Sequence, residues 1–129
     1  MVKETVMQYS RALRVQDLLK KEISQIILEM LKDPQIGFVT ITAVEVSADL
    51  KIAKVFYSVL GTPQEKQNTA SALNRARGFV QAEINRRVRM KKTPQINFEF
   101  DHSLEYGDRI DKIIEQLHQE EKDKSEEDA

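Results

Sequence analysis

The side chains best suited to a chemical task are seven lysines and arginines between Ala72 and Lys92, a stretch in which Glu83 is the only acid. A guanidinium group can hold two phosphate oxygens at once, and faces exposed only to water usually mix both signs of charge. The segment therefore indicates a surface that binds a polyanion such as nucleic acid. A face that is simply solvated remains an alternative.

The candidate contacts to phosphate fall into two groups along the chain. Arg77 and Arg87 lie nearer the apolar side of the predicted helix, so packing through their stems is an alternative for them. For the N-terminal group, solvent exposure is an equally good interpretation. The candidate RNA-binding residues are Arg75, Arg77, Gly78, Arg86, Arg87, Arg89, Lys91 and Lys92, with Arg11 and Arg14 as the N-terminal group.

Six of the candidates, from Arg75 to Arg89, belong to a predicted long helix over residues 65–90, whereas Arg11 and Arg14 belong to the first helix. At about 100° per residue one stripe is apolar, and it consists of Leu73, Val80, Ile84 and Val88. The opposite side is basic, and it consists of Arg75, Arg86 and Arg89. Phe79 does not fit this pattern and Gly78 precedes it, so we expect the helix to bend there. A bend or a bare glycine would allow a phosphate backbone to come close.

No arrangement of residues predicts an active site. The sequence has no cysteine, which rules out a disulfide framework and a cysteine-based metal site. Its two histidines, His102 and His118, are sixteen residues apart, and no nucleophile has an evident base beside it. Asp101 beside His102 is typical of a helix cap. We therefore expect no enzyme, no metal and no cofactor.

The charge is distributed unevenly along the 129 residues, although the net charge is only −1. From Glu99 to Ala129 twelve acids face four bases. We expect one domain over residues 1–118 and a disordered acidic tail over residues 119–129. No apolar run approaches the roughly 20 residues of a membrane span, and the N-terminus has no apolar signal region. These features indicate a cytoplasmic protein.

Three helices are predicted. Ser10 can cap a first helix over residues 10–33, which Asp33-Pro34 ends. The long helix over residues 65–90 is the second. After Ser103 comes a third helix, which carries Leu104, Ile110, Ile113, Ile114 and Leu117.

Three strands are predicted between these helices. Residues 38–47 and 51–60 are rich in β-branched side chains and indicate a hairpin around a short turn. The apolar parity changes inside the first strand, which predicts a β-bulge near Ala43. Residues 93–101 alternate apolar and polar side chains and give the third strand. The order predicts one α+β domain in which a three-stranded sheet packs with helices.

Four stretches, in this order, resemble the ribosome-binding factor A family. They are RALRVQDLLKKEISQIIL, KDPQIGFVTITAVEVSADLKIAKVFYSVLG, ALNRARGFVQAEINRRVRMKKTPQINFEFD and SLEYGDRIDKIIEQL. The resemblance extends from about Arg11 to Leu117. It implies a KH-like domain of the type II topology, in which two helices meet at an Ala-x-Gly break, here Ala76 and Gly78. The sequence contains no Gly-x-x-Gly loop of the kind that ordinary KH modules use to clamp RNA.

The resemblance also implies a function. It implies binding to the immature 30S subunit and its 16S rRNA precursor, support for maturation of the precursor's 5′ end, growth in the cold, and release by a ribosome-associated GTPase. We expect a monomeric, non-catalytic RNA chaperone that favours one rRNA conformation. The alternative is a protein-interaction module whose basic helix binds an acidic protein.

Overall fold

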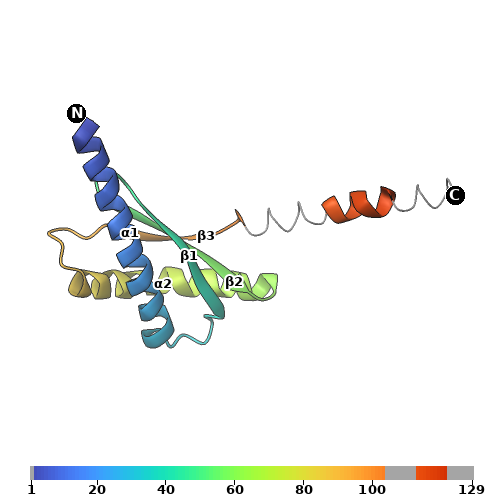
Figure 1. Cartoon of the computed structure of the whole chain (residues 1–129). Helices are drawn as coiled ribbons and strands as arrows, with labels where there is room; N and C mark the ends of the chain where they lie inside the picture. Colours follow the sequence, from blue (N-terminus) through green and yellow to red (C-terminus); the bar gives the residue numbers. More distant parts are fainter. Residues whose placement is uncertain (1, 104–112, 122–129) are drawn as a thin grey trace.

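The computed structural model describes residues 2–103 and 113–121. The named elements are α1 (Val2–Met30), β1 (Phe38–Val46), β2 (Ile52–Leu60), α2 (Pro63–Arg87) and β3 (Gln95–Phe100) (Figure 1). Residues 113–121 are also helical. The α+β architecture with a three-stranded sheet is as predicted.

The sheet has the strand order β1-β2-β3, so β2 is its centre. β1 and β2 are antiparallel and joined by a tight turn, whereas β2 and β3 are parallel and joined through α2. The register of β1 against β2 shifts between Ile41 and Ala43, which confirms the predicted bulge. Because of this extra residue, Ile41 and Val44 are both buried although they differ in parity.

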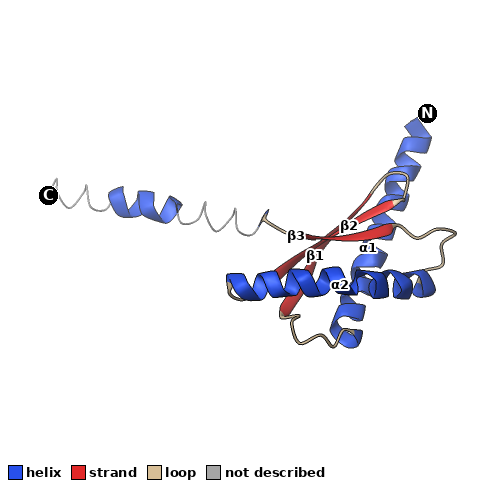
Figure 2. Cartoon of the chain, turned by 180° about the vertical axis from the view of Figure 1, so that it is seen from behind, coloured by secondary structure: helices blue, strands red, loops and turns tan. Residues whose placement is uncertain are grey.

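The core lies between the sheet and the two long helices (Figure 2). Every second residue of β2 is buried, namely Ala53, Val55, Tyr57 and Val59. α1 contributes Leu19, Ile23 and Ile26, and α2 contributes Leu73, Val80 and Ile84. Both helices therefore share one cluster, and the predicted apolar stripe of α2 is confirmed, including Val88 just beyond the helix end.

α2 begins with a complete set of local signals. The Thr62 side chain accepts a hydrogen bond from the Glu65 N–H, and the Glu65 side chain accepts one from the Thr62 N–H. Pro63 occupies the first turn. The helix then continues without interruption to Arg87. The expected break between two helices at Ala76 and Gly78 is therefore wrong. Gly78 has no positive φ, and Phe79 lies off the apolar stripe, where the residue is 44% exposed.

Several predicted helix ends are also wrong. The first helix begins at Val2, so Ser10 lies inside it and cannot cap it. The last described helix crosses His118 and continues to residue 121, whereas the tail was expected to start at residue 119. Its apolar residues Ile113, Ile114 and Leu117 are about half exposed. Leu104, Ile110 and residues 122–129 lie outside the described residues. None of the described helices is long and apolar enough to pass through a bilayer.

Candidate nucleic-acid interface

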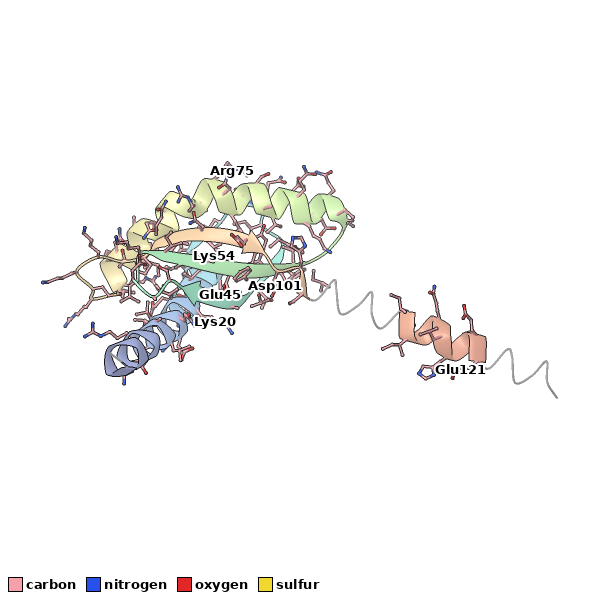
Figure 3. All side chains as sticks on the ribbon, turned by 90° about the horizontal axis from the view of Figure 1, so that it is seen from above. Lys20, Glu45, Lys54, Arg75, Asp101 and Glu121 are labelled. Atoms are coloured by element: carbon pink, nitrogen blue, oxygen red, sulfur yellow. The ribbon has the colours of Figure 1, made fainter. Side chains whose placement is uncertain are left out.

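The exposed face of α2 carries Arg75 and Arg86, and each is paired with a carboxylate of the chain. Arg75 Nη2 lies 3.2 Å from Asp33 Oδ2, and Arg86 Nη2 lies 2.8 Å from Glu83 Oε2. Both side chains remain well exposed, at 60% and 70%, and Figure 3 shows Arg75 on the side of α2 away from the sheet. Exposed ion pairs of this kind contribute little stability, so a ligand phosphate could replace either carboxylate at small cost.

Arg77 and Arg87 turn toward the interior, as their position near the apolar stripe suggested. Arg77 donates from Nη1 to the Ile96 carbonyl oxygen at 3.3 Å. Arg87 is only 24% exposed and joins the two long helices, with Nη1 at 3.3 Å from Glu22 Oε2 and Nε at 3.4 Å from Glu83 Oε2. These two arginines therefore stabilise the fold, and neither presents an open guanidinium group.

The acids beside the α2 arginines stay ionised. Hydrogen bonds from Arg86 lower the pKa of Glu83, with a smaller effect from Arg87. The backbone N–H of Gln35 lowers the pKa of Asp33, and the Arg75 side chain lowers it further. A negative charge therefore accompanies this side of α2 at neutral pH, and the uninterrupted basic face that the sequence suggested is partly neutralised.

A second basic surface lies just beyond the C-terminal end of α2, and we call it the basic groove. It is a hollow of about 900 Å³ between α1, the β1–β2 turn and the loop after α2. None of its cations forms an ion pair with any residue that the structure describes. They are Arg11, Arg14, Lys51, Arg89, Lys91 and Lys92.

The groove forms where α2 ends and the chain continues as an extended loop. We expected the helix to continue to Met90, which would place Arg89 beside Arg75 and Arg86. Instead Val88 is extended, with φ −97° and ψ 124°, although its N–H still bonds the Ile84 carbonyl oxygen. Arg89 therefore lies in the loop after the helix, where it lines the groove together with Arg14 and Leu18 of α1.

The loop after α2 is held against the helix by amide side chains. Gln81 donates to the Pro94 carbonyl oxygen at 3.0 Å and accepts from the Ile96 N–H at 2.8 Å. The Thr93 hydroxyl bonds Asn85 Oδ1. Pro94 is fully buried. The lysines of this loop are thus carried on a fixed backbone beside the groove.

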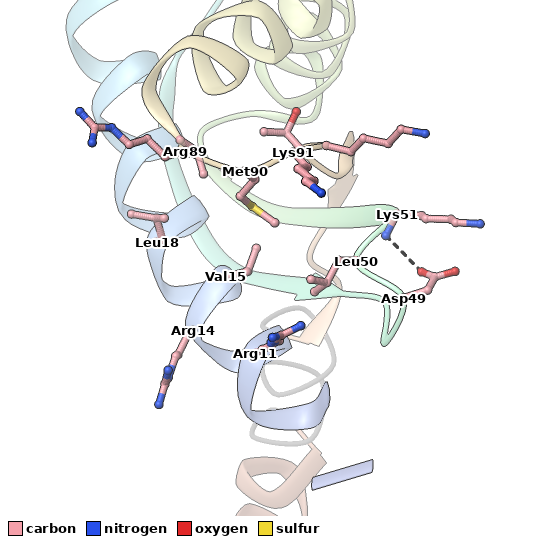
Figure 4. A pocket seen from close by; sticks show the side chains of 13 residues that line it. Arg11, Arg14, Val15, Leu18, Asp49, Leu50, Lys51, Arg89, Met90 and Lys91 are labelled. Carbon is pink, nitrogen blue, oxygen red and sulfur yellow. Dashed lines mark hydrogen bonds between the residues drawn. The ribbon is translucent and has the colours of Figure 1, made fainter. Parts of the chain in front are cut away.

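The floor of the groove is apolar. Figure 4 shows Val15, Leu50 and Met90 pointing toward one another, while Arg14 and Arg89 extend outward. These three apolar residues pack against the core yet remain partly exposed. Leu18, 41% exposed, extends the floor along α1.

Lys51 and Leu50 were not predicted as site residues, because the sequence indicated only a short turn of a hairpin at this position. The one acid in the groove, Asp49, accepts from the Ser47 hydroxyl at 2.6 Å and from the Lys51 N–H at 3.1 Å, and these bonds lower its pKa. The sequence carried no local signal for these two residues, because the turn is distant along the chain from both basic segments and nothing in it indicated that the turn lies next to α1.

Gly78 lies on a shallower hollow of about 510 Å³ that also reaches Arg77, Asn85, Thr93 and Lys51. A Cβ atom added at Gly78 would meet no heavy atom within 4 Å, so packing does not require a glycine at this position. The glycine leaves the backbone of α2 bare on the side of the predicted RNA contacts.

No group of three His, Asp or Glu side chains that could hold a metal ion occurs among the described residues. The His102 ring lies 5.0 Å from the Phe100 ring, centroid to centroid, in an edge-on arrangement. Asp101 accepts from the Ser103 N–H and hydroxyl, and residues 104–112, which follow in the helix that it was expected to cap, lie outside the described ranges. The cations that line the basic groove are suited to binding anions.

Known proteins resemble this chain over most of its length. A sequence model of the family described as Ribosome-binding factor A matches residues 11–114. The crystal structure of ribosome-binding factor A from Thermus thermophilus is 26% identical, with a TM-score of 0.64, and the match covers 71% of this chain and 97% of that one.

Two further structures are similar. A Thermotoga maritima protein determined by solution NMR is 38% identical with a TM-score of 0.55, over 65% of this chain and 84% of that one. A Thermus thermophilus ribosome-binding factor A, fitted into a cryo-EM map of its complex with the 30S subunit, is 29% identical with a TM-score of 0.56, over 67% and 91%. The likeness confirms the predicted α+β fold and agrees with its KH-like topology.

Proposed function

The chain belongs to the ribosome-binding factor A family, and from this premise we propose that it binds the immature small ribosomal subunit by contacting 16S rRNA through the basic groove. The observation that carries the proposal is the grouping of six cations around one hollow with a single acid, Asp49. Polyanion binding by lysine and arginine releases counterions from the nucleic acid, which supplies sequence-independent affinity. A related protein from Thermus thermophilus has been described in complex with the 30S subunit.

The arginines of α2 form a second zone in this proposal. Arg75 and Arg86 would first have to release Asp33 and Glu83, so they contribute less than the cations of the groove. Gly78 lies on a hollow that shares Lys51 and Thr93 with the groove, and the bare backbone there leaves room for a phosphate group.

The activity we propose is that of a non-catalytic RNA chaperone. A protein that prefers one rRNA conformation shifts the population toward it by its difference in affinity for the two states, and needs no chemical step. On the same basis we propose that a monomer acts in the cytoplasm during late maturation and 5′-end processing of precursor 16S rRNA. A ribosome-associated GTPase would then release it.

Co-sedimentation with purified small subunits over a series of salt concentrations tests this function. We expect the protein to travel with the subunits at low salt and to dissociate as salt rises, because phosphate contacts are screened. Ribonuclease treatment should abolish the association. Binding that survives ribonuclease would instead favour an acidic protein partner and would contradict the proposal.

A further inference from the structure

We propose that the basic groove takes a single RNA strand with one base turned out of its stack, rather than helical RNA. This inference rests on the proposed function and specifies its ligand. In helical RNA the bases are stacked inside, so a protein meets phosphates, sugars and base edges. A single strand can also present the flat face of a base. The groove has a surface suited to each part of an unstacked nucleotide.

The apolar floor is the first observation. A surface that contacts only phosphates has no use for exposed apolar side chains, which are costly to leave in water. Here Leu18 is 41% exposed, and Val15 and Met90 are only partly buried, at the bottom of a hollow surrounded by cations. A nucleobase placed on this floor would cover apolar surface while its own phosphates remain within reach of the rim.

The backbone of Leu50 is the second observation. Leu50 has φ 61°, and it is the only non-glycine residue with a positive φ among those that the structure describes. This conformation costs an L-residue with a bulky side chain roughly 1–2 kcal/mol, whereas glycine adopts it freely. A leucine therefore occupies a position at which glycine would be less strained. Its side chain lies on the floor of the groove (Figure 4).

The third observation is a continuous path from the groove. A small hollow formed by Asn85, Met90, Lys91, Lys92 and Thr93 adjoins the groove and shares residues 90–93 with it. The hollow at Gly78 shares Asn85 and Thr93 with this small hollow and Lys51 with the groove. A strand whose base lies on the floor can thus continue past Lys51 to the bare backbone of α2. Three lysines, Lys51, Lys91 and Lys92, and the bare backbone at Gly78 along this path suit a chain of phosphates.

Binding of defined RNA probes to the full-length protein tests the inference. The probes are a fluorescein-labelled ten-nucleotide single strand, the same strand annealed to its complement, the same strand with one central abasic site, and adenosine 5′-monophosphate as a free nucleotide. At equal salt we expect the single strand to bind about tenfold more tightly than the duplex, a typical effect of one favourable base contact. A series that moves the abasic site along the strand should weaken binding at one position. The free nucleotide should compete only weakly.

Variants of the floor have a matched control on the same helix. Leu18→Ala and Leu50→Gly should bring single-strand and duplex affinities to within about threefold, because each removes floor surface and keeps every cation. Leu28→Ala removes the same side chain from α1 at a position that is 83% exposed and outside the groove, so it should keep the full preference. Thermal unfolding of each variant checks that it remains folded.

Three results would overturn the inference. They are equal affinity of wild type for both RNA forms, an unchanged preference in both floor variants, and competition by adenosine 5′-monophosphate as strong as by the strand. The last would assign the groove to a free nucleotide. If any of these occurred while salt-sensitive binding to small subunits persisted, the proposed function would stand without this inference. Loss of subunit binding in the wild type would remove the proposed function itself.

Discussion

Arg86 and Arg87 are adjacent in sequence and carry the same charge, yet their surroundings differ. Arg86 is 70% exposed and touches one carboxylate. Arg87 is 24% exposed, joins Glu22 of α1 to Glu83 of α2, and places Nη2 at 3.1 Å from Met30 Sδ. The helical wheel indicated which arginine is closer to the core. It could not identify Glu22, which is 65 residues away in the sequence.

This difference predicts unequal losses of stability. Arg87→Ala should lower the free energy of unfolding by about 1–2 kcal/mol, because it breaks a partly buried link between the helices and removes the partner of Glu22, while Glu83 keeps Arg86. Arg86→Ala should change it by less than about 0.5 kcal/mol. Urea denaturation of both variants measures the two values. Equal losses would mean that Arg87 does not link the helices.

Asp101 is a residue whose protonation should affect stability. Its Oδ1 accepts from Ser103, and its Oδ2 accepts from the hydroxyl of Thr42, the extra residue of the β-bulge, at 2.6 Å. The Ser103 hydroxyl, followed by the Thr42 hydroxyl, lowers the pKa of Asp101 below its ordinary value of 3.8. The folded state therefore favours the ionised carboxylate.

The direction of the pH effect follows from the lowered pKa. A group with a lower pKa in the folded state contributes stability above its unfolded pKa, and this contribution is lost as pH falls through the folded pKa. Asp101→Asn should therefore be less stable than wild type at pH 7, and the two should converge below about pH 3.8. Thermal unfolding from about pH 7 to about pH 2.5 would show this, and a difference that grows toward acid pH would contradict it.

At the scale of elements, the interior of each helix and strand was predictable and the ends were less so. The apolar period of α2 and the change of parity in β1 are local patterns, and both were interpreted correctly. The end of α2 was placed three residues too late, because Val88 is apolar and continues the stripe after the helix has ended. Because of this error, the sequence analysis placed Arg89 on the exposed face of the helix, whereas in the structure it lines the groove.

The continuous helix makes Gly78 a site for stabilisation. Glycine in a helix interior costs about 0.5–1 kcal/mol relative to alanine, and an added Cβ would meet nothing within 4 Å. Gly78→Ala should therefore raise the free energy of unfolding by up to about 1 kcal/mol. Chemical denaturation measures the change. A clear loss of stability would indicate that α2 is not a regular helix at this position.

At the scale of the whole molecule, the sequence predicted two basic groups, one near Arg11 and one near Arg89, but it did not predict that they lie on the same groove. The β1–β2 turn joins them and adds Lys51, and this proximity depends on how α1 crosses the sheet. Such tertiary placement has no local signature. The sequence also indicated no partner for Arg75, which folding pairs with Asp33, a residue 42 positions away.

The central claim is that the unpaired cations of the basic groove, more than the paired arginines of α2, contact RNA. The most direct test compares two double variants that each remove two positive charges, Arg89→Ala with Lys92→Ala, and Arg75→Ala with Arg86→Ala. Their binding to purified small subunits is measured over a range of salt concentrations. The groove variant should bind more weakly and reduce the slope of log affinity against log salt by about 1.4–1.8, and the α2 variant should change it by less than about half as much. An equal reduction of the slope in both double variants, or a larger reduction in the α2 variant, would contradict the claim.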